Sequence, residues 1–414
     1  MSGIVLSASV RQNLLSLQDT ASLLATTQNR LATGNKVNSA LDNPTNFFTA
    51  QGLNNRASDI NNLLDSIGNG VQVLQAANTG ITSLQKLVDT AKSIANQVLQ
   101  APTGYTTKAS ATSLAPTGAG PLQVAGTTAD LTNAGTNSLN GKTFIFTPAA
   151  GAATTITVSS TVAAGNVNSI DAFNAALTSA GLGLTASLAS DGSITLTSSN
   201  DNASQTLTTG TTAVANNIAI SGTDTATLVT PTGGSAGAPV ADPASQAIRK
   251  SLVNQYNDII TQISTTAQDS SFNGINLLNG DNLKLTFDET GKSTLNITGV
   301  TYDAAGLGLG SLASGTDFLD NASANAALTK LSSASTTLRT EASALGSNLS
   351  VVQLRQDFNK SLIDVLQTGA SNLTLADSNE EAANSQALST RQSIATSALA
   401  LANTSQQSVL QLLR

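Results

Sequence analysis

The sequence predicts a mainly α-helical protein with long, paired, coiled-coil-like helices from both termini, a β-hairpin, and an inserted β-rich (α+β) outer domain. Three observations support this prediction. Apolar residues recur at alternating steps of three and four near both ends, which is the seam of a coiled coil. Between Thr103 and Ala241 the pattern changes to the alternation typical of strands. A second alternating stretch surrounds Gly291 and indicates a hairpin.

The two ends of the chain carry matching seams. One such run could equally pack on its own domain, but two runs at opposite ends favour pairing of the ends with each other or within a larger bundle. A single narrow seam on an Ala/Ser/Gln-rich helix is marginally stable in water, so we expect these helices to order on assembly. The predicted inner assembly residues are Val10, Leu14, Leu17, Leu24, Leu31, Leu388, Leu399, Val409 and Leu413.

Two longer helices follow the same pattern. Gly34-Asn35 ends the first helix, and Asn43-Pro44 marks a turn before a second helix that continues to Ala101-Pro102. The longest seam predicts another helix from Asn321 to Leu375. The residues expected to pack these helices together are Leu64, Ile67, Val71, Leu74, Leu338, Leu345, Leu349 and Val352.

The interior of the chain predicts a β-rich module. "KTFIFTP" and "TTITVSS" are typical of paired strands, and "SIDAFNAALTSAG" of a short capped helix. "TASLASDGSITLTS" predicts a hairpin that turns at Asp191-Gly192. The later hairpin places Leu283 and Leu285 opposite Ile297 and Leu295.

These elements predict four parts. Residues 1–44 and 376–414 form an inner terminal-helix domain; 45–101, 242–300 and 321–375 form a helical core domain with its hairpin at 283–298; 102–241 form the variable outer insert; and 301–320 form a connection.

Composition excludes several functional classes. The chain has no Cys and no His, which removes Cys- and His-based metal sites, Ser-His-Asp triads and Cys nucleophiles. Its net charge of −7 argues against nucleic-acid binding. No apolar run is long enough for a transmembrane helix, and the N-terminus lacks the features of a cleaved signal peptide. We therefore expect no enzymatic activity, no cofactor, no metal and no membrane insertion.

Three separated motifs resemble bacterial flagellins. "QNRLATGNKVNSALDNP" is similar to the family signature after the first helix, "FNGINLLNG" to the turn before the flagellin hairpin, and the final segment from Ala376 to the family's C-terminus with its Leu-Leu-Arg. The residues that carry the first two motifs are Arg30, Leu31, Gly34, Asn38, Ser39, Ala40, Phe272, Asn273 and Gly274. The insert departs from the familiar pattern, because it follows the first long helix and not the hairpin.

The resemblance implies a structural subunit that polymerises into the extracellular helical filament of the bacterial flagellum, the passive propeller for swimming motility. It implies type III export without a cleaved signal peptide. The implied partners are other copies of the chain, sibling flagellins, hook-filament junction proteins, a filament cap and an export chaperone, with O-glycans on the Ser/Thr-rich insert.

Two alternatives are weighed against this interpretation. A hook-filament junction protein would share the same terminal helices but form one short ring. An enzyme displayed on a filament, such as the metallopeptidase of some flagellins, would need a His-Glu-x-x-His helix, and the chain has no His.

Overall fold

The computed structural model describes residues 8–112, 131–132, 139–149, 151–161, 163, 165–189, 193–209, 217–222 and 238–412. It contains two compact units, which are treated separately below. The terminal unit comprises Met1–Gln72, Leu283–Ile297 and Ser347–Arg414, and the central unit comprises Val73–Asn282 and Thr298–Gly346.

Five long helices make the protein mainly α-helical, as predicted. They are α1 (Ala8–Thr33), α2 (Pro44–Gln100), α4 (Pro243–Asp269), α5 (Asn321–Thr374) and α6 (Ser378–Leu412). Their ends follow local chemistry. Gly34 has φ +71°, a left-handed conformation that ends α1 at little steric cost. The Asn43 side chain accepts a hydrogen bond from the backbone N–H of Asn46 (3.0 Å), and Pro44 fits the first turn of α2.

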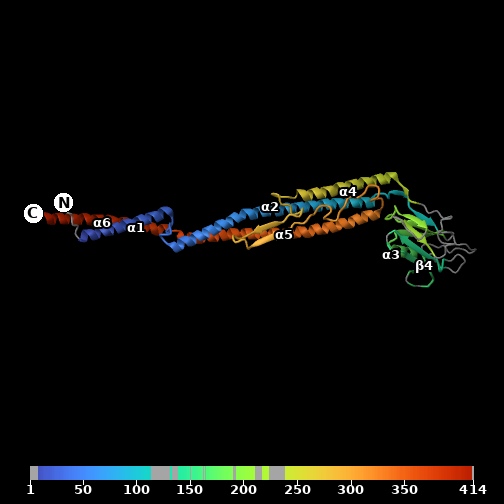
Figure 1. The fold of residues 1–414 in the computed structure, drawn as a ribbon, viewed down its shortest axis with the longest axis horizontal. Helices are drawn as coiled ribbons and strands as arrows, with labels where there is room; N and C mark the ends of the chain where they lie inside the picture. Colours follow the sequence, from blue (N-terminus) through green and yellow to red (C-terminus); the bar gives the residue numbers. More distant parts are fainter. Residues whose placement is uncertain are drawn as a thin grey trace, which may run out of the picture. The chain divides into compact units, whose positions relative to one another are not determined.

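In the terminal unit, α1 and α6 lie side by side (Figure 1). Arg30 near the end of α1 contacts Glu381 at the start of α6, so the two helices run in opposite directions. The predicted hairpin forms from β11 (Leu283–Thr286) and β12 (Thr294–Ile297), with Leu283 opposite Ile297 and Leu285 opposite Leu295. It packs closely on α2, where a Cβ at Gly70 would clash with a Leu285 methyl.

In the central unit, the second part of α2 packs with α4 and the first part of α5. The α2 stripe is completely closed to solvent at Leu74, Ala77, Ile81, Leu84 and Val88. Its spacing of three and four residues is the periodicity that predicted the helix. The heptad pattern therefore corresponds to a real core in this unit.

The described part of the insert contains three small sheets. β1 (Tyr105–Thr107) pairs with β10 (Val240–Ala241) where the insert joins the helices. A three-stranded sheet has the order β2-β7-β6, and a five-stranded sheet has the order β5-β4-β3-β9-β8. The strands and the one helix are β2 (Ser110–Thr112), β3 (Thr143–Pro148), β4 (Thr154–Val158), β5 (Asn166–Val167), α3 (Ile170–Ser179), β6 (Leu184–Leu188), β7 (Ile194–Ser198), β8 (Thr206–Thr209) and β9 (Asn217–Ser221).

The insert confirms the predicted β3/β4 pair, the α3 helix and the β6/β7 pair. The proposed turn at Asp191-Gly192 lies outside the described residues. The sequence pattern predicted no strand at β2, β8 or β9, whereas all three join the sheets. The ring of Phe173 of α3 lies edge-on against the ring of Phe144 of β3, with 5.0 Å between the ring centroids. Because each aromatic side chain is large, few of them suffice to fill this small core.

None of the helices within the described ranges has the length and apolar character required to cross a membrane. The two compact units divide the chain within α2 and α5, at Gln72 and Ser347. The four-part division made from the sequence remains a prediction.

Candidate assembly surface

The contact between α1 and α6 buries little of either helix. Of the predicted inner assembly residues, only Val10 is buried, at 3% exposure, while Leu17, Leu24, Leu388 and Leu399 are half-buried. Leu14 and Leu31 are 37% and 42% exposed. Leu413 and the side chain of Val409 lie outside the described part of the chain. Their role in assembly remains a prediction.

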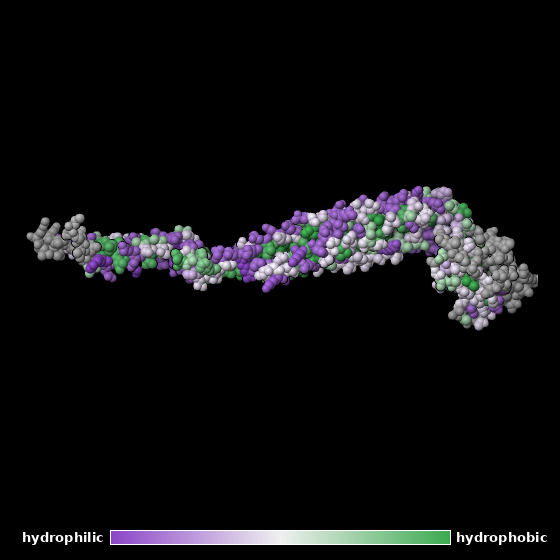
Figure 2. Space-filling model, in the orientation of Figure 1, coloured by the Kyte–Doolittle hydropathy of each residue, from purple (hydrophilic) through white to green (hydrophobic). Residues whose placement is uncertain are grey.

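Large apolar side chains therefore reach the surface of both helices. Figure 2 shows apolar residues along this pair, interspersed with polar ones. The members with more than a third of their surface exposed are Leu14, Leu15, Leu23, Leu31, Ile394 and Leu401. We call these six the terminal apolar set. Two helices bury only the stripe between them, so residues on the remaining faces need further neighbours to leave water.

The base of the α1/α6 pair is fixed by backbone hydrogen bonds. The N–H groups of Lys36 and Val37 both donate to the carbonyl of Thr374, at 2.7 and 3.3 Å. The N–H of Ala376 donates to the carbonyl of Gly34 at 2.9 Å. The segment after α1 is thus tied to the junction between α5 and α6.

An ion pair joins the same two helices. Arg30 Nη1 lies 3.3 Å from Glu381 Oε1, and the Glu381 side chain is only 10% exposed. Glu381 lies in the first turn of α6, where a carboxylate is favoured by the helix dipole. Arg30, which the sequence singled out as a motif residue, contributes to the registration of α1 against α6.

The remaining residues of the first motif form a tight turn. The Asp42 carboxylate accepts hydrogen bonds from the N–H groups of Asn38 and Ser39, both at 2.9 Å. These donors, Ser39 first, lower the pKa of Asp42 below its ordinary value of 3.8. Ala40 is half-buried beside them. The motif therefore holds the chain between α1 and α2 in one conformation.

The second motif shapes the turn after α4. Asn273 and Gly274 have φ +50° and +80°, a pair of conformations suited to Asn and Gly. Phe272 is 37% exposed. The sequence did not identify the neighbouring Asn276, which is 5% exposed and donates to the carbonyls of Ala267 and Gln268 at the end of α4. Its position shows that the motif caps a helix.

Most of the predicted helical-core residues are buried, although no finding tests their role in assembly. Ile67, Leu74, Leu338, Leu345, Val352 and Val71 are 8% exposed or less, and Leu64 and Leu349 are half-buried. Asn359 occupies a seam position at 2% exposure and donates to the carbonyl of Phe287 at 3.0 Å. Its amide therefore links α5 to the hairpin.

Arg249 is the functional residue that sequence reasoning missed. It is completely buried, and its guanidinium donates to the carbonyls of Pro102 (2.7 Å), Phe318 (2.7 Å) and Ala101 (3.1 Å). Desolvation lowers its pKa, an effect that the nearby Asp320 opposes. Because Ala101 follows α2 and Phe318 precedes α5, Arg249 joins three helices at the base of the insert.

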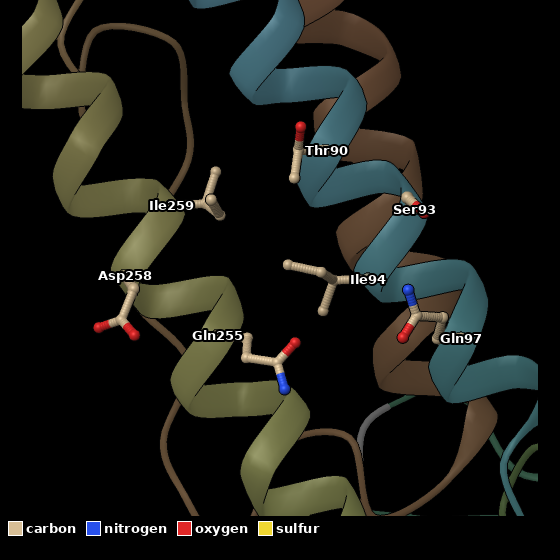
Figure 3. Close-up of a pocket in the computed structure, with 7 residues that line it drawn as sticks. All are labelled: Thr90, Ser93, Ile94, Gln97, Gln255, Asp258 and Ile259. Atoms are coloured by element: carbon tan, nitrogen blue, oxygen red, sulfur yellow. The ribbon is translucent and has the colours of Figure 1, made fainter.

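A groove of about 370 Å³ lies between α2 and α4 in the central unit (Figure 3). Its lining is Thr90, Ser93, Ile94, Gln97, Gln255, Asp258 and Ile259. Asp258 is the one carboxylate among its lining residues. Among the described residues, no three His, Cys, Asp or Glu side chains gather as a metal site would require.

Comparison with known proteins places the similarity at the two ends of the chain. Residues 5–116 match the bacterial flagellin N-terminal helical region, and residues 328–413 match the bacterial flagellin C-terminal helical region. The flagellin FljM of Caulobacter vibrioides is 30% identical over 164 residues, which is 39% of this chain and 59% of that protein. Flagellin FljO of the same organism is 29% identical over 171 residues, 41% of this chain and 62% of its own length.

Flagellin A of Rhizobium meliloti is 39% identical over 124 residues, which is 30% of this chain and 27% of that protein. The chain thus spans about three fifths of the Caulobacter proteins it matches and less of the Rhizobium one. Most of the insert falls outside both family matches.

Proposed function

We infer that this chain, which belongs to the bacterial flagellin family, polymerises into the helical filament of the bacterial flagellum. In this proposal it is a structural subunit and not an enzyme. Its work is to present surfaces that repeat from one copy to the next without closing into a ring. The resulting filament acts outside the cell as a passive propeller.

The terminal apolar set carries the proposal. Six large apolar side chains on α1 and α6 are exposed in the single chain. Complete burial of one such side chain lowers the free energy of a protein or complex by about 1.5–3 kcal/mol relative to leaving it in water. Neighbouring copies that cover them would supply the missing contacts. This supports an inner tube built from residues 1–44 and 376–414.

The finer expectations belong to the same proposal. Residues 45–101, 242–300 and 321–375 would surround the inner tube, and the insert would face outward with O-linked sugars on its Ser and Thr residues. The chain would leave the cell through the type III apparatus with an export chaperone. It would contact sibling flagellins, junction proteins and the filament cap.

Polymerisation of the purified full-length chain tests the proposal. We expect long filaments by electron microscopy and a pelleted fraction that grows with protein concentration above a threshold. Short closed rings would support the hook-filament junction alternative, which no observation favours. A chain that stays monomeric at all concentrations, with and without filament seeds, would contradict both roles.

A further inference from the structure

Two chain crossings join the insert to the helices of the central unit. One leaves α2 through β1, and the other enters α4 from β10. These two strands pair at Tyr105–Ala241 and Thr107–Val240, with an irregular register between the two pairs. A two-stranded ribbon is only marginally stable by itself. If these strands were the only connection, the insert would be free to swing on them.

The turn between β7 and β8 is a rigid part of the insert. The N–H of Ser199 donates to the carbonyl of Gly183 at 2.8 Å. The N–H of Asn202 donates to the carbonyl of Ser199 at 3.2 Å, and the N–H of Gln205 to the carbonyl of Asn202 at 3.0 Å. Ala203, in the middle of the turn, is completely buried. The turn therefore moves together with the sheets of the insert.

The same turn is bound to the start of α5. The N–H of Ala322 donates to the carbonyl of Asp201 at 2.9 Å, which satisfies one of the free donors of the first helical turn. The Ser204 hydroxyl donates to Asp320 Oδ2 at 2.5 Å. A hydrogen bond from a hydroxyl to a carboxylate is charge-assisted and stronger than one between neutral groups. Two hydrogen bonds thus hold the insert against α5 as a third connection to the helices.

Asp320 also belongs to the packing of the helices. Its Oδ1 accepts a hydrogen bond from the N–H of Ser323 at 3.3 Å, as a helix cap does. Desolvation lowers the pKa of the buried Arg249, and the negative charge of Asp320 opposes this effect. Arg249 in turn binds the carbonyls of Ala101 and Pro102. One carboxylate therefore connects the turn of the insert to α5 and to the junction around Arg249.

We propose that the turn Ser199–Gln205, here called the insert latch, fixes the orientation of the insert on the helices, and that the insert swings on β1 and β10 when the latch is released. The observation that carries this proposal is the pair of hydrogen bonds from Ser204 and Asp201 to the start of α5. The latch makes the direction in which the insert presents its surface a property of the single chain. The proposal does not depend on filament formation.

The test measures the distance between the insert and α4 in the dilute full-length chain by pulsed electron paramagnetic resonance. The chain has no Cys, so Ser179→Cys on α3 and Lys250→Cys on α4 place two spin labels at exposed positions. We expect one narrow distance distribution from the chain with an intact latch. Ser204→Asp puts a second carboxylate against Asp320, and the distribution should become at least about twice as broad.

Two further variants separate release of the latch from general damage to the insert. Asn200→Asp is the matched control, because it adds the same charge at an exposed position of the same turn and should keep the distribution narrow. Ser204→Asp combined with Asp320→Ser exchanges the donor and the acceptor, and it should restore the narrow distribution, since Ser also caps a helix.

Four results would overturn the proposal. They are a broad distribution from the chain with an intact latch, an unchanged distribution in Ser204→Asp, an equal broadening in Asn200→Asp, and an exchanged pair that does not narrow the distribution again.

Discussion

The terminal and central units differ in how completely they bury their apolar side chains. Of the seventeen large apolar residues that are strongly exposed in the described chain, thirteen belong to the terminal unit and four to the central unit. The terminal unit is the smaller of the two. Its exposed residues lie on α1, on α6, on the chain between α1 and α2, at the start of α2 and between α5 and α6. Its part of α5 carries an exposed row of Val351, Leu354, Phe358 and Val365.

The central unit, in contrast, buries most of its large apolar side chains. Tyr256 and Phe318 pack edge-on at 5.8 Å and are 2% exposed or less. Its part of α2 has neighbours on more than one side, whereas among the described helices α1 packs along its length with α6 alone. The comparison teaches that exposure follows the number of packing neighbours and not the hydrophobicity of the helix. Under the proposed function, the terminal unit is the part that other copies would complete.

Removing Ser385–Arg414 should have the largest effect on polymerisation. The truncation deletes most of α6, so α1 loses its partner and the terminal apolar set loses two of its six residues, Ile394 and Leu401. We expect a soluble chain that forms no filaments in electron micrographs, while the central unit keeps its thermal transition. Filaments of normal length from this truncation would contradict the pairing of the terminal helices.

Ile394→Asp should weaken assembly without unfolding the chain. Ile394 is 64% exposed, so a charge there costs little in the monomer but would be buried in a polymer. We expect the threshold concentration for polymerisation to rise at least about tenfold. Ile248→Asp is the matched control in the central unit, since Ile248 is 51% exposed on α4. Equal threshold concentrations for the two variants would show that the exposed apolar residues of the terminal unit are no more important for polymerisation than those of the central unit.

Arg249→Met should destabilise the central unit while leaving the α1/α6 pair unchanged. The substitution removes the guanidinium donor from the carbonyls of Ala101, Pro102 and Phe318, of which Phe318 is buried. We expect a loss of about 3 kcal/mol in the free energy of unfolding of this unit. Denaturant unfolding measures it, with the neighbouring exposed Lys250→Ala as control. A loss no greater than that of the control would show that the buried guanidinium is not needed.

Replacing Thr103–Ala241 with a short Gly/Ser linker should change assembly little. The exposed apolar rows lie outside this segment, and Arg249 keeps its partners at Ala101 and Pro102. We expect filaments with an unchanged threshold concentration but a smaller diameter. Loss of polymerisation in a chain that stays helical by circular dichroism would show that the insert bridges subunits.

Acidification should release the Asp42 turn with a small effect. Because the folded state lowers the pKa of Asp42, its contribution is fully present above the ordinary value of 3.8 and is lost as the pH falls through the lower folded value. Amide resonances of Asn38 and Ser39 should therefore shift only below that ordinary value. In Asp42→Asn they should not titrate with pH, and a transition above the ordinary value would contradict the assignment.

The sequence predicted those helices and strands that a pattern of neighbouring residues is enough to specify. The heptads predicted α2 and α5, Asn43-Pro44 predicted the start of α2, and alternation predicted the hairpin and its register. Prediction from the sequence failed where a residue or strand has partners far away in the chain. The burial of Arg249 could not be predicted, since its three carbonyl partners come from other parts of the chain. β9 pairs with β3, far away in the sequence, and could not be recognised from its own composition.

The terminal assembly residues were predictable only in part for a related reason. A seam predicts which face of a helix is apolar. Because its steps alternate between three and four residues, it does not decide which of two neighbouring positions on that face is the more buried. In the structure Thr27 of α1 is 7% exposed, whereas the next predicted seam residue, Leu31, is 42% exposed. The contacts that Leu31 makes in a polymer depend on a second copy, which no single chain contains.

Hydrogen exchange of the full-length chain before and after polymerisation tests the central claim most directly. The account predicts that amides of α1 and α6 exchange rapidly in the monomer and become strongly protected in the filament. Amides of the β3, β4 and β9 sheet should exchange at the same rate in both states. Terminal helices that are already protected in the monomer and do not change, with new protection appearing in the insert, would contradict the account.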